Sequence, residues 1–120
     1  MTPKELENRL IDYAVLMIKI ASLLPKLPEG DVLRYQLTKS GTSSALNYGE
    51  AQEAESKNDF IHKMKICNKE LRESGVNLKI IDRAELLKNH SEILSKGMKE
   101  TNELIAIFTS SIKTTRKGIK

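Results

Sequence analysis

Apolar side chains recur at spacings of three and four residues along nearly the whole chain, which is the period of an amphipathic helix. Four such stretches are visible, and we expect helices at roughly 3–24, 31–54, 57–86 and 91–115. No alternating runs are joined by an Asn-Gly or Asp-Gly turn, so the pattern predicts no β-hairpin. Four helices with short connections favour antiparallel neighbours. The expected fold is an all-α, up-down-up-down four-helix bundle in a single domain over residues 1–120.

Caps and prolines mark the ends of the first two helices. Thr2 and Glu5 form a capping-box pattern at the start of the first helix. We expect Pro25 and Pro28 to end that helix, because the residue before a proline avoids the helical conformation. Asp31 is the expected cap of the second helix.

The second helix contains an unusual segment, residues 39–45, which reads Lys-Ser-Gly-Thr-Ser-Ser-Ala. These residues have poor to middling helix propensity and, taken locally, favour a loop. The four-three spacing nevertheless continues across them from Leu37 to Ala51. We therefore predict a continuous helix whose small side chains let a neighbouring helix approach closely. Its hydroxyl groups are expected to bond to carbonyls one turn earlier.

The composition excludes several classes of protein. A single cysteine among 120 residues excludes a disulfide-stabilised scaffold and a multi-cysteine zinc module. No apolar run approaches the ~20 residues that a membrane span needs. The first twenty residues carry Glu5, Glu7 and Asp12, which a secretory signal would not contain. We expect a cytoplasmic, helix-rich domain with no membrane contact.

Catalytic and metal-binding patterns are nearly absent from the sequence. The two histidines, His62 and His90, lie in no His-x-x-x-His or Glu-x-x-His spacing, so a ferritin-like metal pair is not expected. Cys67 lies on the apolar stripe of the third helix and is expected to be a buried structural thiol rather than a nucleophile. We expect no enzymatic activity, no metal and no cofactor.

The first helix has more apolar surface than one packing seam requires. Ile11, Val15 and Ile18 lie off its main stripe, beside Ala14 and Ala21. A second apolar face favours contact with another subunit, although a wide core-facing arc gives the same pattern. Similar extra apolar positions occur in the fourth helix, at Ile93, Leu104 and Ile107.

Asn47 and Glu50 are further candidates for the contact between subunits. Glu50 begins a small acidic group at the end of the second helix. Such a group is ordinarily a solvated helix end, and the alternative is a buried polar contact with a neighbouring helix or subunit. The predicted homo-oligomer interface comprises Ile11, Val15, Ile18, Asn47 and Glu50.

Positive charge is concentrated in two places. The net charge of +4 divides into −2 for residues 1–56, +3 for 57–83, −1 for 84–112 and +4 for 113–120. On the third helix the basic residues follow one line at four-three spacing, about 200° around the helix from Cys67. The line, which we call the basic ridge, comprises Lys65, Lys69, Arg72, Lys79 and Arg83.

The basic ridge should face outward and is suited to nucleic-acid phosphates, with Lys113, Arg116 and Lys117 of a basic tail over 113–120 assisting. The alternative is a solvated face, partly neutralised by pairs such as Lys69–Glu73 and Asp59–Lys63. Aromatic residues make up only 4% of the chain, so binding should favour duplex shape or backbone over stacked single strands. A protein-interaction scaffold without nucleic-acid binding is the competing hypothesis.

Two segments carry a resemblance to a known family. The first segment has the pattern Gln-Leu-x-Lys-Ser, followed further along the same helix by Asn and Glu. The second segment begins with the pattern Ser-x-x-Asp-Phe. The combination resembles the four-helix bundle proteins encoded in intervening sequences of bacterial 23S rRNA genes, over roughly residues 5 to 116. The matching positions are Gln36, Leu37, Lys39, Ser40, Ser43, Asn47, Glu50, Ser56, Asp59, Phe60, Lys69, Glu70, Leu71, Arg72 and Glu73.

The resemblance implies a bundle that assembles as a ring-like homopentamer. A wider relative, the accessory variability protein of diversity-generating retroelements, is a basic pentamer that binds nucleic acid and a reverse transcriptase. The resemblance thus implies RNA or DNA, and a reverse transcriptase or another protein, as partners. This chain departs from the family at Lys39, where arginine is usual, and at residues 75–77, where an aromatic pair is common.

Overall fold

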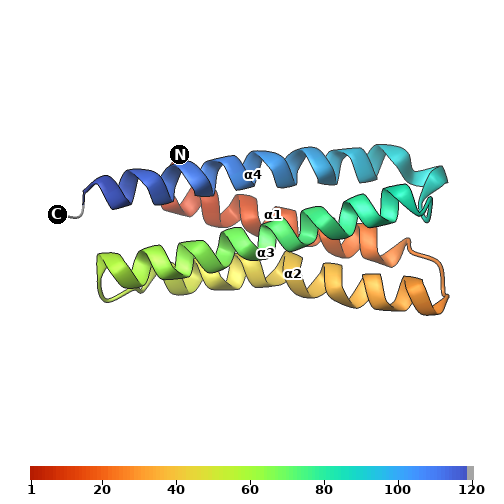
Figure 1. The fold of residues 1–120 in the computed structure, drawn as a ribbon, viewed down its shortest axis with the longest axis horizontal. Coiled ribbons are helices and arrows are strands. Elements are labelled where there is room, and N and C mark those ends of the chain that lie inside the picture. The colour runs from red at the N-terminus through yellow and green to blue at the C-terminus, as the bar shows by residue number, and fades with distance from the viewer. Residues whose placement is uncertain (119–120) are drawn as a thin grey trace.

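The structure, a computed structural model, describes residues 1–118. Four helices, α1 (Pro3–Ser22), α2 (Pro28–Gln52), α3 (Lys57–Arg83) and α4 (Ser91–Lys117), follow one another, with a short 3₁₀ turn, Lys88–His90, before α4. Consecutive helices run in opposite directions and pack in sequence, α1 on α2, α2 on α3 and α3 on α4 (Figure 1). The predicted all-α four-helix bundle is confirmed. None of the helices within residues 1–118 is long and apolar enough to cross a membrane.

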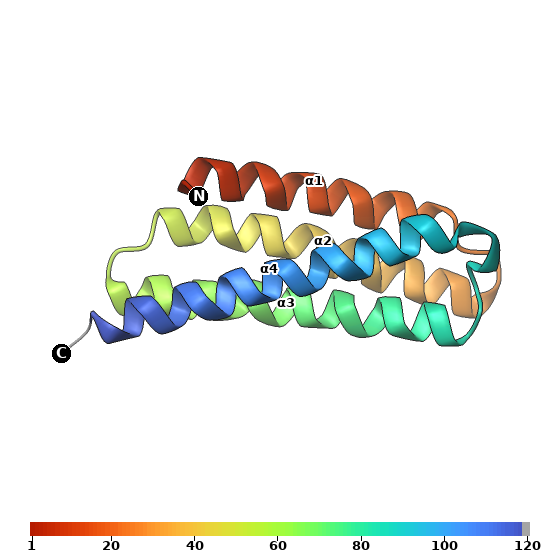
Figure 2. The same cartoon turned by 90° about the horizontal axis from the view of Figure 1, so that it is seen from above.

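The fourth helix crosses the bundle obliquely (Figure 2). It starts close to the end of α1 and lies over α3 toward its own C-terminus. Packing between α1 and α4 is accordingly looser than packing between consecutive helices. The molecule is a rod with extents of 50 × 21 × 21 Å.

The second helix begins three residues earlier than expected. Pro28 occupies its first turn and Leu27 is its N-cap, so Pro28 starts α2 instead of ending α1. A proline is well tolerated there because the first amide of a helix has no intrahelical acceptor. Asp31 does not cap the helix and forms an ion pair with Arg34, 2.7 Å between Oδ1 and Nη1. The first helix ends at Ser22, ahead of the expected residue 24.

The other helix ends differ from expectation by two or three residues. α2 ends at Gln52 instead of 54, and α4 continues to Lys117 instead of 115. α3 ends at Arg83 instead of 86 because Glu85 adopts a left-handed conformation with φ 58°. The amide of Leu86 then donates to the carbonyl of Ile81 at 3.1 Å, which is the closing bond of a Schellman motif. The motif usually uses glycine, so the sequence gives little sign of it.

The small-residue segment of α2 is helical throughout and closely packed, as predicted. A Cβ atom added to Gly41 would lie 2.7 Å from the Cβ atom of Met17, so α1 approaches the α2 backbone directly. Thr42 Oγ1 donates to the carbonyl of Thr38 at 2.8 Å, and Ser44 Oγ donates to the carbonyl of Gly41 at 2.9 Å. The absence of a side chain at residue 41 therefore sets the distance between α1 and α2.

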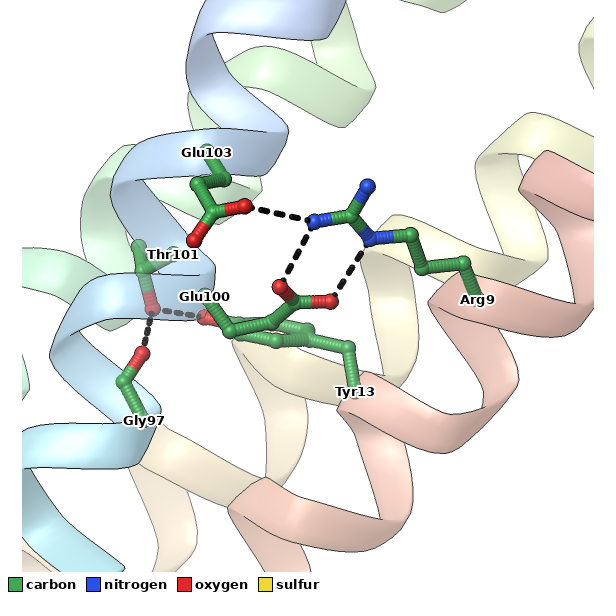
Figure 3. A network of polar contacts seen from close by, with 6 residues as sticks. All are labelled: Arg9, Tyr13, Gly97, Glu100, Thr101 and Glu103. Carbon is green, nitrogen blue, oxygen red and sulfur yellow. Dashed lines mark hydrogen bonds and ion pairs between the residues drawn. The ribbon is translucent and has the colours of Figure 1, made fainter. Parts of the chain in front are cut away.

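Buried hydroxyl groups form a polar layer in the middle of the bundle. Thr101 Oγ1 donates to the carbonyl of Gly97 at 2.7 Å and lies 2.7 Å from the hydroxyl of Tyr13 (Figure 3). Because Thr101 uses its only proton on Gly97, Tyr13 is the donor to Thr101. In the same layer, the Ser40 and Ser74 hydroxyls are 2.6 Å apart. Burial raises the pKa of Tyr13, which keeps its hydroxyl protonated as a donor.

An ion pair that the sequence pattern did not indicate joins α1 to α4. Arg9 donates to both carboxylate oxygens of Glu100, at 2.8 and 2.7 Å, and to Glu103 at 3.2 Å (Figure 3). The hydrogen bonds to Glu100 are the main cause of a raised pKa for Arg9. A bidentate pair of this kind fixes orientation as well as distance. It therefore connects α1 to α4, whose packing is looser than that between consecutive helices.

The close approach at Gly41 leads to a stability prediction. We expect Gly41→Ala to lower the free energy of unfolding by about 1–3 kcal/mol, since the new methyl group overlaps Met17 and overpacks the core. Gly49→Ala is the matched control, because nothing lies within 4 Å of its added Cβ atom. It should raise stability by about 0.5–1 kcal/mol through helix propensity. Urea unfolding measures both, and equal stabilisation by the two changes would contradict the packing described.

Candidate nucleic-acid interface

The basic ridge lies on the outer side of α3. All five of its side chains are exposed, whereas Cys67, Leu71 and Leu78 on the opposite side of the helix are fully buried. The predicted outward orientation is confirmed. Within residues 1–118 none of the five forms an ion pair shorter than 4.0 Å, so their charges are open to solvent. The rise per residue places Arg83 about 27 Å along the helix from Lys65.

The ion pairs expected to neutralise this face are not the ones that form. Lys63 pairs with Glu50 of α2 at 3.0 Å instead of with Asp59 one turn earlier, and that hydrogen bond is the main cause of a raised pKa for Lys63. Lys69 and Glu73 form no ion pair in the described part of the chain. Glu50 thus bonds to a residue beside the ridge, and the ridge itself keeps its charge.

A groove of about 1370 Å³ runs between α2 and α3 beside the basic ridge. Lys65, Lys69 and Arg72 of the ridge belong to its lining. The remaining lining is mixed and was not predicted as a site. Apolar and exposed side chains occupy one end: Val32, Tyr35, Val76 and Ile80. Polar and charged side chains of the two helices, among them the further cation Lys39, complete it: Asp31, Gln36, Lys39, Ser40, Asn68, Glu70, Glu73 and Asn77, with Ile112 of α4.

Glu70 is the half-buried carboxylate of the groove. Partial burial, and then the neighbouring carboxylate of Glu73, raise the pKa of Glu70. Both causes disfavour the charged form of this carboxyl group. The one trace of this groove in the sequence is Val76, which interrupts the line of basic residues and is 56% exposed.

The three C-terminal cations belong to α4 and not to a separate tail. Lys113, Arg116 and Lys117 are exposed in its last turns, where positive charge suits the helix dipole. α4 ends where α3 begins, and Lys57 Nζ lies 3.4 Å from the carbonyl oxygen of Gly118 (Figure 1). These cations therefore lie at the end of the bundle nearer to Lys65 than to Arg83. The rest of the predicted tail, residues 119–120, lies outside the described residues.

The surplus apolar positions divide between core and surface. Ala14, Ala21 and Leu104 are buried, so for them the wide core-facing arc is the correct explanation. Ile93 and Ile107 are partly buried against the core. Ile11, Val15 and Ile18 remain 47%, 44% and 45% exposed on α1, and their place in a subunit interface stays a prediction.

Asn47 and Glu50 make contacts within the chain. The side chain of Asn47 is half-buried and donates to the carbonyl of Ser43 at 2.8 Å, within α2. Glu50 reaches α3 through Lys63 but is exposed, which agrees with a solvated helix end and not with the alternative of a buried polar contact with a neighbouring helix. Contact of either residue with another subunit stays a prediction.

The interior holds one thiol with little reactivity. Cys67 is fully buried, and burial raises its pKa to about 12. The prediction of a buried structural thiol is confirmed. Within residues 1–118, no three side chains of His, Cys, Asp or Glu gather as a metal site would require.

These features define a class, the four-helix bundle with a basic outer face, and comparison with known proteins gives the family. The family described as 23S rRNA-intervening sequence protein matches residues 5–110, and the chain belongs to it. A crystal structure of a protein with unknown function from the S23 ribosomal protein family of Bacteroides thetaiotaomicron is similar, with a TM-score of 0.83 and 27% identity. The similarity covers 94% of this chain and 99% of that one. Among the curated proteins nothing matches.

The burial of Cys67 predicts slow alkylation of the folded protein. With a pKa of about 12, almost no thiolate is present at pH 8, whereas an unfolded cysteine is partly ionised there. Iodoacetamide at pH 8 should label the native protein at least ~10-fold more slowly than protein in urea. Mass spectrometry of timed samples measures both rates, and equal rates would place the thiol at the surface.

Proposed function

We propose that this protein is a non-enzymatic, oligomeric bundle that binds the phosphate backbone of RNA or DNA through α3. The observation that supports this best is the basic ridge, five exposed cations in one line with no ion-pair partner in the described chain. Neutralising phosphates with such cations releases condensed counterions, which drives association. Lys113, Arg116 and Lys117 add exposed positive charge at the end of α4, beside the start of α3.

Self-association would bring several basic ridges together in one particle and so strengthen binding to phosphates. The three exposed isoleucine and valine side chains of α1 support a contact between copies, because apolar side chains at one-turn spacing form a stripe that water does not favour. In the pentamer that the family resemblance implies, five copies would together carry a charge of +20 and five ridges. Several ridges on one particle raise the effective concentration of binding sites along a nucleic acid.

A protein-interaction scaffold is the second candidate, and the exposed apolar end of the α2–α3 groove favours it. In that case the ridge is only solubilising, and a reverse transcriptase or another protein is the partner. The two candidates differ in what the ridge charges do, so charge reversal separates them.

Charge reversal on the ridge should weaken nucleic-acid binding strongly. We expect Lys69→Glu with Arg72→Glu to reduce affinity for a labelled RNA or DNA at ~50 mM salt by at least about 10-fold, because two phosphate contacts are lost and repulsion is added. The matched control is Lys96→Glu with Lys99→Glu, two exposed cations of α4 with the same change in net charge. Fluorescence anisotropy measures both, and equal losses would show that net charge alone acts.

Removing the apolar stripe of α1 should dissociate the oligomer. We expect Ile11→Asp with Val15→Asp to shift the mass toward the 13.5 kDa of one chain, because buried carboxylates without partners are costly at an interface. Val76→Asp, an exposed apolar position on α3, is the control. Multi-angle light scattering gives the masses. A wild-type protein that is already monomeric would contradict self-association.

A further inference from the structure

The α2–α3 groove has the layout of a site for nucleotides and not only for phosphates. Its rim on the α3 side is formed by Lys65, Lys69 and Arg72, whose charges have no ion-pair partner in the described chain. Behind this rim lies a space of about 1370 Å³ that cations do not fill. A duplex resting on the ridge would leave that space empty, because its bases are stacked inside the helix.

Tyr35 provides the aromatic surface in the groove. The chain has five aromatic residues, and Tyr35, which is 68% exposed, is the one that lies at the surface. Val76 and Ile80 face the same groove from α3 and are 56% and 47% exposed. An exposed tyrosine beside cations suits a base, since every base has a face that stacks on an aromatic ring. The low aromatic content of the chain led us to expect duplex binding. Tyr35 nevertheless places one exposed aromatic ring in the groove itself.

The polar groups within the groove suit base edges and oppose phosphates. Gln36 and Asn77 carry amides that both donate and accept hydrogen bonds. Glu70 and Glu73 carry carboxyl groups, which repel phosphate but accept hydrogen bonds from amino groups of bases. Asn77 is buried and Glu70 half-buried in the groove, whereas Lys65, Lys69, Arg72 and Lys39 are exposed along it, so the two parts of a nucleotide have different places.

We propose that the α2–α3 groove binds unpaired bases of a single-stranded nucleic acid whose phosphates follow the basic ridge. The inference rests on the proposed function and deepens it by naming the form of nucleic acid. Tyr35 stacks on a base, the amides and carboxyl groups of the groove contact base edges, and the ridge cations contact the backbone. An acidic peptide also carries negative charge, but Glu70 and Glu73 oppose carboxylates in the groove, so the charge pattern favours a nucleotide chain.

Binding of two matched oligonucleotides tests the inference. One is a labelled single strand of about 12 nucleotides without self-complementarity, within the usual range of single-strand sites, and the other is a hairpin duplex with the same number of phosphates. Wild-type protein should bind the single strand more tightly. Tyr35→Ala should weaken single-strand binding by roughly 5- to 100-fold and leave duplex binding unchanged, whereas Tyr35→Phe should retain most of the affinity because it can still stack.

Controls separate the groove from the surface in general. Leu46→Ala changes another exposed apolar residue of α2, also 68% exposed, that is not part of the groove lining, and should leave both affinities unchanged. If the duplex binds as well as the single strand and Tyr35→Ala affects neither, the inference is wrong while the proposed function stands. If neither nucleic acid binds, the proposed function itself fails. Displacement of the single strand by polyglutamate of equal charge would identify an anionic-peptide site instead.

Discussion

Burial of the apolar face of α3 is the constraint on which the outer surface of this bundle depends. Leu71, Leu78 and Cys67 are fully enclosed, and turning α3 to expose them would cost about 1.5–3 kcal/mol for each large side chain. The rotation of the helix about its own axis is therefore fixed by its core side. Because the ridge lies about half a turn away, it has one orientation, directly outward. The groove follows from the same constraint, since one flank of α3 between ridge and core faces α2.

The interior uses small residues and hydroxyl groups where a simpler bundle would use aliphatic side chains. Gly41 brings α1 against α2, and a side chain at Gly97 would meet Ile20 and Met17. Such close approach leaves little space for large side chains, and Ser40, Ser74, Thr101 and Tyr13 satisfy one another's hydrogen bonds in the layer between. Packing of this kind gives one arrangement of the helices and not several of equal energy. The helices that carry the surface charges consequently have fixed positions relative to one another.

The sequence sufficed for the order of the helices, the buried face of each and the outward direction of the ridge, because all three follow from a period of 3.6 residues. It did not suffice for the start of α2 at Pro28, where a proline that ends one helix and one that begins another look alike. Nor did it show the end of α3, where Glu85 adopts a left-handed conformation that glycine usually occupies. The groove and the Arg9–Glu100 pair were missed for a common reason, since each joins different helices and depends on how those helices pack.

Direct contact between phosphates and the ridge cations makes the affinity for nucleic acid fall as the salt concentration rises. For a single-stranded oligonucleotide, neutralising four or five phosphates predicts that log K falls against log salt concentration with a slope of about −3. Titrations by anisotropy between ~50 and ~200 mM salt would measure it over the range in which electrostatic binding changes most. A slope near −3 is the result expected of a backbone held by the ridge. A slope near zero would mean that any binding comes from uncharged contacts and would contradict the account.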